Sequence, residues 1–251
     1  MLEIIDWPSG QKQVTFPEAS GLVYHPLRET LFVVGDEGFI GEVALDGTLL
    51  RQEAVQAIDL EGITVDPQSG LLYGAVEGDD LILELDPDTL EILRQINIER
   101  PFQGEILLAK GGSGIEAITF VADEDVESGG YFLLANQNKR TGKSIPDPSV
   151  LVRVDLPPQQ NDVFETTAVI TQAFYPNIPD MSGLHFDASD GHLFVISDRA
   201  DGLFKVTVEG DILYEDFLPG KKQEGFTVDR DGVFYIAQDS GSILKAVDNQ
   251  K

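Results

Sequence analysis

Three glutamates stand at the same point of three similar segments of the chain: Glu61, Glu116 and Glu224. Each is followed by a small residue and then by a large apolar residue. Two further segments begin in the same way but carry a serine at this point, Ser20 and Ser182. Carboxyl groups act as acids, bases and ligands of hard metal ions, so side chains of this kind that meet in space would form a reactive or cation-binding site.

A second polar position closes each of the five segments. It follows the first by 16, 16, 21, 16 and 15 residues and is occupied by Asp36, Glu77, Gln137, Asp198 and Asp239. The two positions are expected on neighbouring antiparallel strands, which lie about 4.8 Å apart. We therefore expect the first positions to form an inner ring around a common axis and the second positions to form an outer acidic ring. Seven of the ten positions are carboxylates.

Carboxylates that converge on a narrow space repel one another. Either their pKa values rise and they take up protons, or they hold a cation. The chain has no Cys, and no His lies near these positions, which favours Ca²⁺, and Mg²⁺ less so, over zinc. The sequence thus predicts a calcium site at Glu61, Glu116 and Glu224. The alternative is that the acids cap turns and pair with Lys139, Arg199, Lys221 or Lys222.

The elements that would position these acids are short strands. Apolar stretches such as residues 31–34 and 193–196 are too short for helices and rich in strand-forming residues. Turn sequences such as the one at residues 66–70 separate the first stretch from the second. A third stretch follows in all five segments, and a fourth follows in four of them. Four antiparallel strands repeated around an axis form the blades of a β-propeller.

We therefore predict an all-β protein in which residues 1–251 form a single five-bladed β-propeller. The fifth segment ends after its third strand, so residues 2–16 are expected to supply its outer strand and close the ring, which removes an exposed sheet edge. A six-bladed propeller is the alternative, with a degenerate blade near residues 99–113 or 155–178. Residues 99–113 and 137–149 do not fit the repeat and are long connections.

The chain is strongly acidic, with 44 Asp and Glu against 17 Lys and Arg and a net charge of −27. This charge repels nucleic acid and anionic lipid and favours cations or basic partners. No run of roughly 18 apolar residues is present, so no membrane span is predicted. The first residues lack the basic and apolar regions of a signal peptide. We expect a monomer that binds no nucleic acid.

Several other polar side chains are assigned to the framework. His25 and His192 are expected in turns on the face opposite the acids, and His185 is expected to pack within its strand. Thr64, Thr119 and Thr227 share one register and are expected to face a neighbouring blade. The chain has no Gly-x-Ser-x-Gly elbow, which excludes the serine esterases of the α/β-hydrolase type.

The strings EASGLVYHP at residues 18–26, LFVVGDEG at 31–38, DLEGIT at 59–64 and KQEGFT at 222–227 resemble the SdiA-regulated (YjiK-like) propeller family. The shorter EGFT is similar to a phytase-like, "esterase-like" propeller family and, more distantly, to calcium-dependent lactonases. The resemblance implies a bacterial β-propeller that is often extracytoplasmic. Members commonly carry an N-terminal membrane anchor, which the first residues here do not show. The resemblance assigns no catalytic residue.

Three functions fit these observations. The first is a propeller that binds Ca²⁺ at the acidic mouth of its channel and presents a face to a small-molecule or protein ligand. The second is a metal-dependent hydrolase of a phosphate ester or lactone, with Asp198 or Asp239 as the base. The third is a scaffold whose acids are only solvated. We favour binding over catalysis, because so many acids around one ion exceed what catalysis needs and would repel a phosphate.

Overall fold

The computed structural model describes residues 2–55, 59–108, 114–136, 149–160 and 163–248. Every regular element in these ranges is a β-strand. Four of the repeated segments fold into antiparallel units of four strands each. Unit 1 contains β3 (Ala19–His25), β4 (Thr30–Gly35), β5 (Phe39–Ala44) and β6 (Leu49–Ala54). Unit 2 contains β7 (Leu60–Val65), β8 (Leu72–Val76), β9 (Leu81–Leu85) and β10 (Ile92–Glu99).

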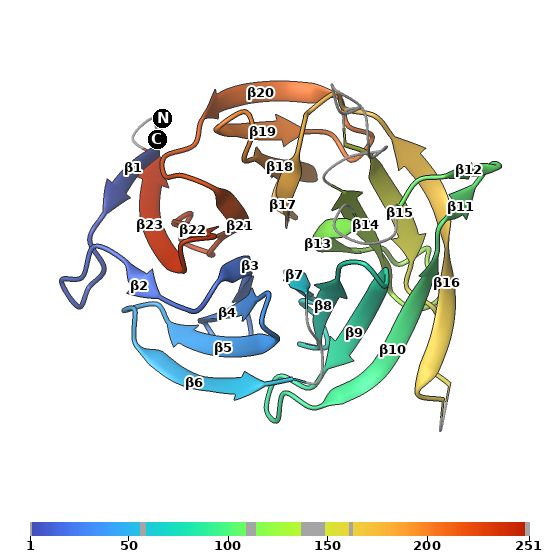
Figure 1. The fold of residues 1–251 in the computed structure, drawn as a ribbon, viewed down its shortest axis with the longest axis horizontal. Coiled ribbons are helices and arrows are strands. Elements are labelled where there is room, and N and C mark those ends of the chain that lie inside the picture. Colours follow the sequence, from blue (N-terminus) through green and yellow to red (C-terminus); the bar gives the residue numbers. More distant parts are fainter. Residues whose placement is uncertain (1, 56–58, 109–113, 137–148, 161–162, 249–251) are drawn as a thin grey trace.

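Units 3 and 4 follow the same plan. Unit 3 contains β13 (Ile115–Ala122), β14 (Gly130–Asn136), β15 (Leu151–Asp155) and β16 (Glu165–Phe174). Unit 4 contains β17 (Met181–Asp187), β18 (His192–Ser197), β19 (Gly202–Val206) and β20 (Ile212–Phe217). The units are arranged around a central axis, with β3, β7, β13, β17 and β21 innermost (Figure 1). This arrangement is that of a β-propeller, as the sequence predicted.

Unit 5 is built from both ends of the chain. It contains β21 (Gln223–Val228), β22 (Phe234–Gln238) and β23 (Ser242–Asp248). The N-terminal strand β1 (Leu2–Ile5) pairs antiparallel with β23, with Leu2 opposite Asp248. Strand β2 (Val14–Thr15) pairs with the beginning of β23, with Val14 opposite Ile243. Both described chain ends therefore lie beside the same sheet (Figure 1).

The hydrophobic core lies between the units. Each cluster of buried apolar side chains joins two neighbouring units, as Tyr73 of unit 2 and Phe120 of unit 3 do. The same holds from unit 3 to 4, 4 to 5, 5 to 1 and 1 to 2. Trp7, from the connection between β1 and β2, is almost completely buried and packs 5.5 Å from the ring of Tyr235. The sheets of neighbouring units thus pack face to face around the axis.

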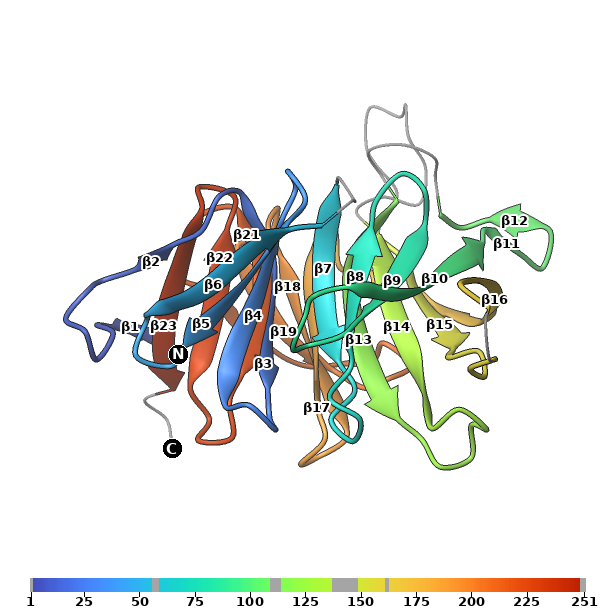
Figure 2. The same ribbon diagram turned by 90° about the horizontal axis from the view of Figure 1, so that it is seen from below.

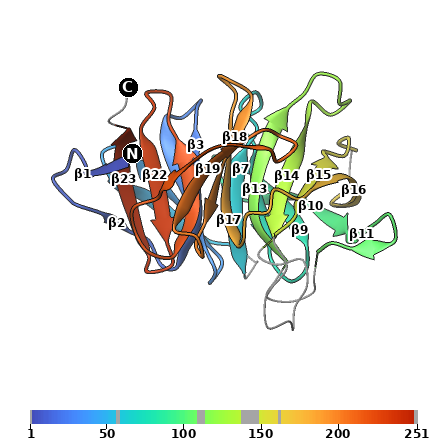
Figure 3. The same cartoon turned by 90° about the horizontal axis from the view of Figure 1, so that it is seen from above.

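One connection departs from the repeat. Strand β10 pairs in parallel with β16, with Gln95 opposite Glu165, and joins units 2 and 3 into one sheet of eight strands. A two-stranded hairpin of β11 (Pro101–Phe102) and β12 (Glu105–Ile106) follows β10. It projects sideways from the ring in the side views (Figures 2 and 3). The sequence predicted a long connection here but neither the hairpin nor the parallel pairing.

Threonine hydroxyls link the inner strands of neighbouring units. Thr64 Oγ1 accepts the backbone N–H of Phe120 at 3.0 Å. Thr119 accepts that of Phe186 at 3.0 Å, and Thr227 accepts that of Tyr24 at 2.9 Å. The prediction that these three threonines face a neighbouring unit is confirmed.

The histidine predictions are correct in part. His185 lies within β17 and packs against the rings of Phe194 and Phe226. The assignment of His25 and His192 to turns is wrong, because they are the last residue of β3 and the first residue of β18. His25 is buried, and its Nε2 lies 2.9 Å from the carbonyl oxygen of Gly70 in unit 2.

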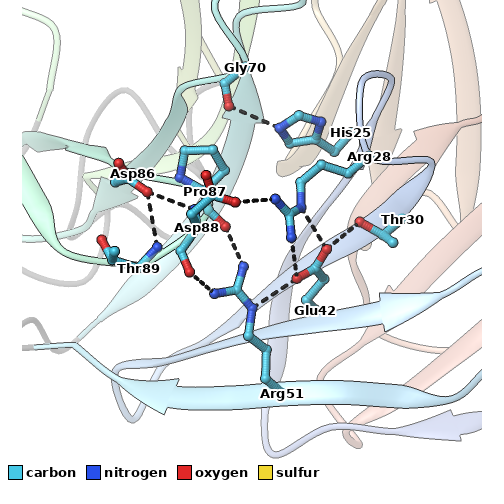
Figure 4. A network of polar contacts seen from close by, with 10 residues as sticks. All are labelled: His25, Arg28, Thr30, Glu42, Arg51, Gly70, Asp86, Pro87, Asp88 and Thr89. Atoms are coloured by element: carbon cyan, nitrogen blue, oxygen red, sulfur yellow. Dashed lines mark hydrogen bonds and ion pairs between the residues drawn. The ribbon is translucent and has the colours of Figure 1, made fainter.

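A buried glutamate with two arginines joins units 1 and 2 (Figure 4). The Glu42 carboxylate accepts hydrogen bonds from Nε of Arg28 and Nε of Arg51, each at 2.8 Å. Both guanidinium groups then reach the turn between β9 and β10, where Arg51 donates to the carbonyl oxygens of Pro87 and Asp88. This pattern satisfies a carboxylate that would otherwise be costly to bury.

Unit 2 repeats the arrangement towards unit 3. The Glu84 carboxylate pairs with Arg94 at 2.6 Å, and both side chains are almost fully buried. Arg94 also donates to the carbonyl oxygen of Pro157 at 2.9 Å. Glu42 and Glu84 lie on the third strand of their units, and Arg51 and Arg94 lie on the fourth. The buried pair of a glutamate and an arginine is therefore repeated in units 1 and 2.

Candidate functional site

The five residues of the expected inner ring occupy equivalent places in the structure. Ser20, Glu61, Glu116, Ser182 and Glu224 are each the second residue of the innermost strand of their unit. The pairing of that strand with the next one shifts register around this residue in every unit. The shifts fall between Ala19 and Gly21, Leu60 and Gly62, Ile115 and Ala117, Met181 and Gly183, and Gln223 and Gly225.

These register shifts are β-bulges. A bulge leaves one residue out of the ladder, bends the strand and changes the direction of the side chain, and bulges are common beside active sites. Here the residue left out of the register is the serine or glutamate itself. All five side chains thus lie at the same kind of bulge, at the beginning of the innermost strand of their unit.

The three glutamates line one cavity of about 260 Å³, which we call the acidic cavity. Its walls consist of Glu18, Ala19, Ser20, Asp36, Glu61, Glu77, Glu116, Glu224 and Asp239. Seven of these nine residues are carboxylates, and none is basic. The structure therefore brings together the inner glutamates, Ser20 and three members of the expected outer ring.

Other members of the two expected rings lie elsewhere. Ser182 and Asp198 are not among the residues that line the acidic cavity. Gln137, the third member of the outer ring, lies outside the described residues. Asp198 accepts a hydrogen bond from the backbone N–H of Gln223, yet its charge still helps to raise the pKa of Glu224. Glu18 lines the cavity although sequence reasoning did not single it out; it directly precedes β3 and has a positive φ of 42°.

The serines bind neighbouring backbone. Ser20 Oγ donates to the carbonyl oxygen of Leu60 in unit 2, and Ser182 Oγ donates to that of Gln223 in unit 5 at 2.6 Å. Both bonds tie the beginning of one inner strand to the beginning of the next. The inner ring thus combines two side chains that hold the units together with three that carry charge.

An apolar layer closes the channel beneath the carboxylates. Each unit contributes the large residue that lies two positions after the serine or glutamate: Leu22, Ile63, Ile118, Leu184 and Phe226. The free space among them is only about 10 Å³. Little room therefore remains on the axis beneath the acidic cavity.

Small residues between the acids and this layer are required by close packing at the axis. A Cβ on Gly62 would lie 3.0 Å from Cγ2 of Ile118, and a Cβ on Gly225 would lie 2.8 Å from the backbone nitrogen of Leu22. Glycine is common where backbones approach closely.

The electrostatics of the acidic cavity favour protonated carboxyl groups. Burial raises the pKa of Glu116 to about 10, helped by a hydrogen bond with Glu77 and by the charge of that residue. Burial raises the pKa of Glu61 to about 8, with a further contribution from Asp36. Burial also raises the pKa of Glu224 to about 8. At neutral pH the three inner glutamates therefore hold protons unless a cation takes their place.

Few cations offset this charge. Lys222 forms an ion pair with Asp239. For Asp239 the structure thus supports the alternative to metal binding, in which the acids pair with nearby basic residues. Glu77 accepts the backbone N–H of Gly114 at 3.0 Å, and nearby Arg100 pairs with Asp80. Lys139 lies outside the described residues. None of the nine described residues that line the cavity is basic.

The carboxylate oxygens are suitable ligands for a hard cation, but the described side chains are too far apart for three of them to coordinate one directly. Within the part of the chain that the structure describes, no three His, Cys, Asp or Glu side chains are close enough to hold a metal ion together. The cavity of about 260 Å³ is also much larger than the roughly 30 Å³ share of one water molecule in the liquid. An ion here would keep much of its own water, or the side chains would close around it.

The family described as SdiA-regulated matches residues 11–241. The chain belongs to the SdiA-regulated family. A search of curated proteins found no significant match to this SdiA-regulated protein. No helix with the length and hydropathy of a membrane span occurs in its described residues.

Two solved structures are similar to this SdiA-regulated protein in fold. Glutaminyl cyclase of Myxococcus xanthus superposes with a TM-score of 0.64 at 12% identity, over 98% of this chain and 95% of that one. The β-propeller domain of Cps50 (Swd1) of Myceliophteria thermophila superposes with a TM-score of 0.54 at 9% identity, over 94% and 98% of the two chains. At such low identity the similarity concerns the propeller fold and not the function.

Proposed function

We propose that the acidic cavity binds a cation and that calcium is its first candidate. The observation that carries this proposal is the composition of the walls, which among the described residues hold seven carboxylates and no basic side chain. Calcium accepts six to eight oxygen ligands in flexible geometry, which suits carboxylates from several strands and a shell of retained water. Magnesium requires a tighter octahedral shell and is the weaker candidate.

Protons and the cation compete for the same oxygens. Glu61 and Glu224 have pKa values of about 8, so both release a proton when a divalent ion binds near pH 7. The ion removes the repulsion that raises these pKa values, which makes the exchange favourable as pH rises. The rim of the cavity then serves as the face that a ligand or partner meets.

Hydrolysis of a phosphate ester is less well supported. The transferred group would carry negative charge, and none of the described residues that line the cavity is basic and could meet it. Asp239 lines the cavity and remains the candidate base, whereas Asp198 does not line it. A neutral lactone would not be repelled, so assays with lactones and with phosphate esters, each with and without calcium, separate the two branches of this alternative.

We further propose that the propeller has five blades, closed by the N-terminal strands. Units 1 to 4 each supply four strands, and β1 gives unit 5 its fourth. A sixth blade would need another four-stranded unit. The described part of the connection near residues 99–108 holds only the β11–β12 hairpin, and β16 already belongs to unit 3.

Thermal denaturation of chelator-treated protein tests the cation proposal. Saturating calcium should raise the melting temperature by about 5 °C or more. The triple variant E61Q/E116Q/E224Q should be more stable than the wild type without calcium and should lose the response to calcium. The control E91Q/E209Q/E215Q makes the same three substitutions at exposed positions and should keep the response. An unchanged melting temperature of the wild type, or an equal response of both triple variants, would overturn the proposal.

A further inference from the structure

The turn between β8 and β9 carries one wall of the acidic cavity and a second, hidden carboxylate. Glu77, which directly follows β8, lines the cavity. Asp80, at the other end of the turn, is completely buried and does not line the cavity. The two side chains are neighbours, because Oδ1 of Asp80 and Cγ of Glu77 lie 3.0 and 3.2 Å from the place that a Cβ on Gly114 would occupy.

Asp80 binds the guanidinium group of Arg100. Nε of Arg100 donates to Oδ2 of Asp80, and Nη2 of Arg100 donates to the carbonyl oxygen of Gly78 at 2.9 Å. Arg100 therefore reaches the residue next to Glu77, although it does not line the cavity itself. Its side chain is 18% exposed, so solvent screens its charge only in part, and the carboxylate of Asp80 offsets the rest.

The second oxygen of the Asp80 carboxylate has no partner. Oδ1 of Asp80 is buried and lacks a hydrogen bond to any described residue. An unsatisfied buried acceptor costs stability. Replacing a buried ion pair by well-packed apolar side chains is often neutral or stabilising. The fold alone therefore gives little reason for Asp80 and Arg100, and the neighbouring acidic cavity gives a better one.

We propose that Asp80 is a positioning residue of the cation site, which binds Arg100 and keeps this guanidinium group away from Glu77. The inference rests on the proposed binding of calcium in the acidic cavity. Without the carboxylate of Asp80, Arg100 would turn to Glu77, since it already bonds to Gly78 beside it. An arginine on Glu77 would occupy one of the seven carboxylates and bring a positive charge to the cavity, and both changes weaken the binding of a cation.

Calorimetric titration of the whole protein with calcium tests this role in a double-variant cycle. D80N should weaken calcium binding by about tenfold or more, because it releases Arg100. R100Q should bind calcium at least as tightly as the wild type. In the R100Q background, D80N should change the affinity by less than about twofold, since no guanidinium group remains to be released.

Asp79 supplies the matched control. It lies in the same turn, directly before Asp80, but is exposed. D79N makes the same substitution and should change the affinity for calcium by less than about twofold, because solvent screens an exposed charge. The comparison of R100Q with D80N/R100Q does not require D80N to fold by itself, since the double variant removes both charges of the buried pair.

Two outcomes would overturn the inference. The first is that D80N binds calcium as tightly as the wild type. The second is that D80N weakens binding equally with and without Arg100, which would mean that Asp80 acts on the cation directly. In both cases the wild type still binds calcium, so the cation proposal stands. A wild type that binds no calcium would instead end the cation proposal and this inference with it.

Discussion

Glu77 raises the pKa of Glu116 through hydrogen bonding and through its negative charge, and only burial contributes more. Two carboxyl groups form such a bond only when one of them carries a proton, because an ionised carboxylate has no donor. Glu116 is 9% exposed and holds the proton, since its pKa is raised to about 10. The pair lies in the acidic cavity together with Glu61 and Glu224. Proton uptake by Glu116 is therefore expected when no cation is bound.

The first prediction concerns the pH dependence of stability. The ordinary pKa of these glutamates is 4.5, and folding raises it to about 8 for Glu61 and Glu224 and about 10 for Glu116. Between these limits the folded state binds more protons than the unfolded state, so the free energy of unfolding should fall as pH rises from about 5 towards 8 and should fall further towards 10. The slope should be on the order of 1 kcal/mol per pH unit for each glutamate that titrates, and it should be steepest between about pH 5 and 8, where all three contribute.

Urea denaturation of chelator-treated protein at a series of pH values measures this slope. The variant E61Q/E116Q/E224Q should have a much flatter profile, because glutamine carries no titrating proton. It should also be more stable than the wild type at pH 9. Parallel profiles for the two proteins would show that the cavity glutamates do not titrate with raised pKa values.

The second prediction concerns proton release on calcium binding. If calcium replaces protons on Glu61 and Glu224, titration calorimetry near pH 7 should give a binding heat that depends on the ionisation enthalpy of the buffer, with about one to two protons released per ion. At pH 9 the release should fall and the affinity should rise. A heat that is equal in all buffers at pH 7 would mean that the ion binds elsewhere or binds beside carboxylates that are already ionised.

The repeated strands and the grouping of the acids follow from local patterns in the sequence. Short apolar stretches and turn sequences define each strand, and the common place of Glu61, Glu116 and Glu224, directly before a small residue and a large apolar residue, puts them at the same end of the inner strands. Close packing of small residues was also predictable, because strands that converge on an axis leave no room for a Cβ, as at Gly62.

The features that the sequence did not predict depend on backbone geometry and long-range pairing. A β-bulge at Glu61 has no compositional mark, since the same residues would fit a regular ladder. Asp198 does not line the cavity, although its spacing from Ser182 equals that of Asp36 from Ser20. The pairing of β10 with β16 joins residues about 70 positions apart, as Gln95 and Glu165 show, and Arg94 reaches Pro157 over a similar distance.

The third prediction concerns the buried ion pair of unit 2. R94A leaves the carboxylate of Glu84 buried without its partner and should lower the free energy of unfolding by about 3–5 kcal/mol. R230A removes an exposed pair with Glu29 and should cost less than about 1 kcal/mol. Adding E84Q to R94A should restore part of the loss, because the remaining cost is largely that of an unpaired charge. Equal effects of R94A and R230A in urea denaturation would contradict this account.

The last prediction concerns the space at the axis. G225A should lower the free energy of unfolding by about 1–3 kcal/mol, because the new Cβ would meet the backbone of Leu22 and Gly21 at 2.8 and 3.0 Å, and backbone cannot move aside as a flexible side chain does. Unit 3 has Ala117 at the equivalent position, so its Cβ is accommodated there. A117G should therefore cost less than about 1 kcal/mol, the effect of glycine in a strand alone.

Calcium binding, measured by the rise in melting temperature, should weaken in G225A and stay unchanged in A117G, since only the former displaces the strand that carries Glu224. If G225A were as stable as the wild type and bound calcium equally well, the inner strands would be looser than their packing indicates, and the fixed arrangement of the three glutamates could not be maintained.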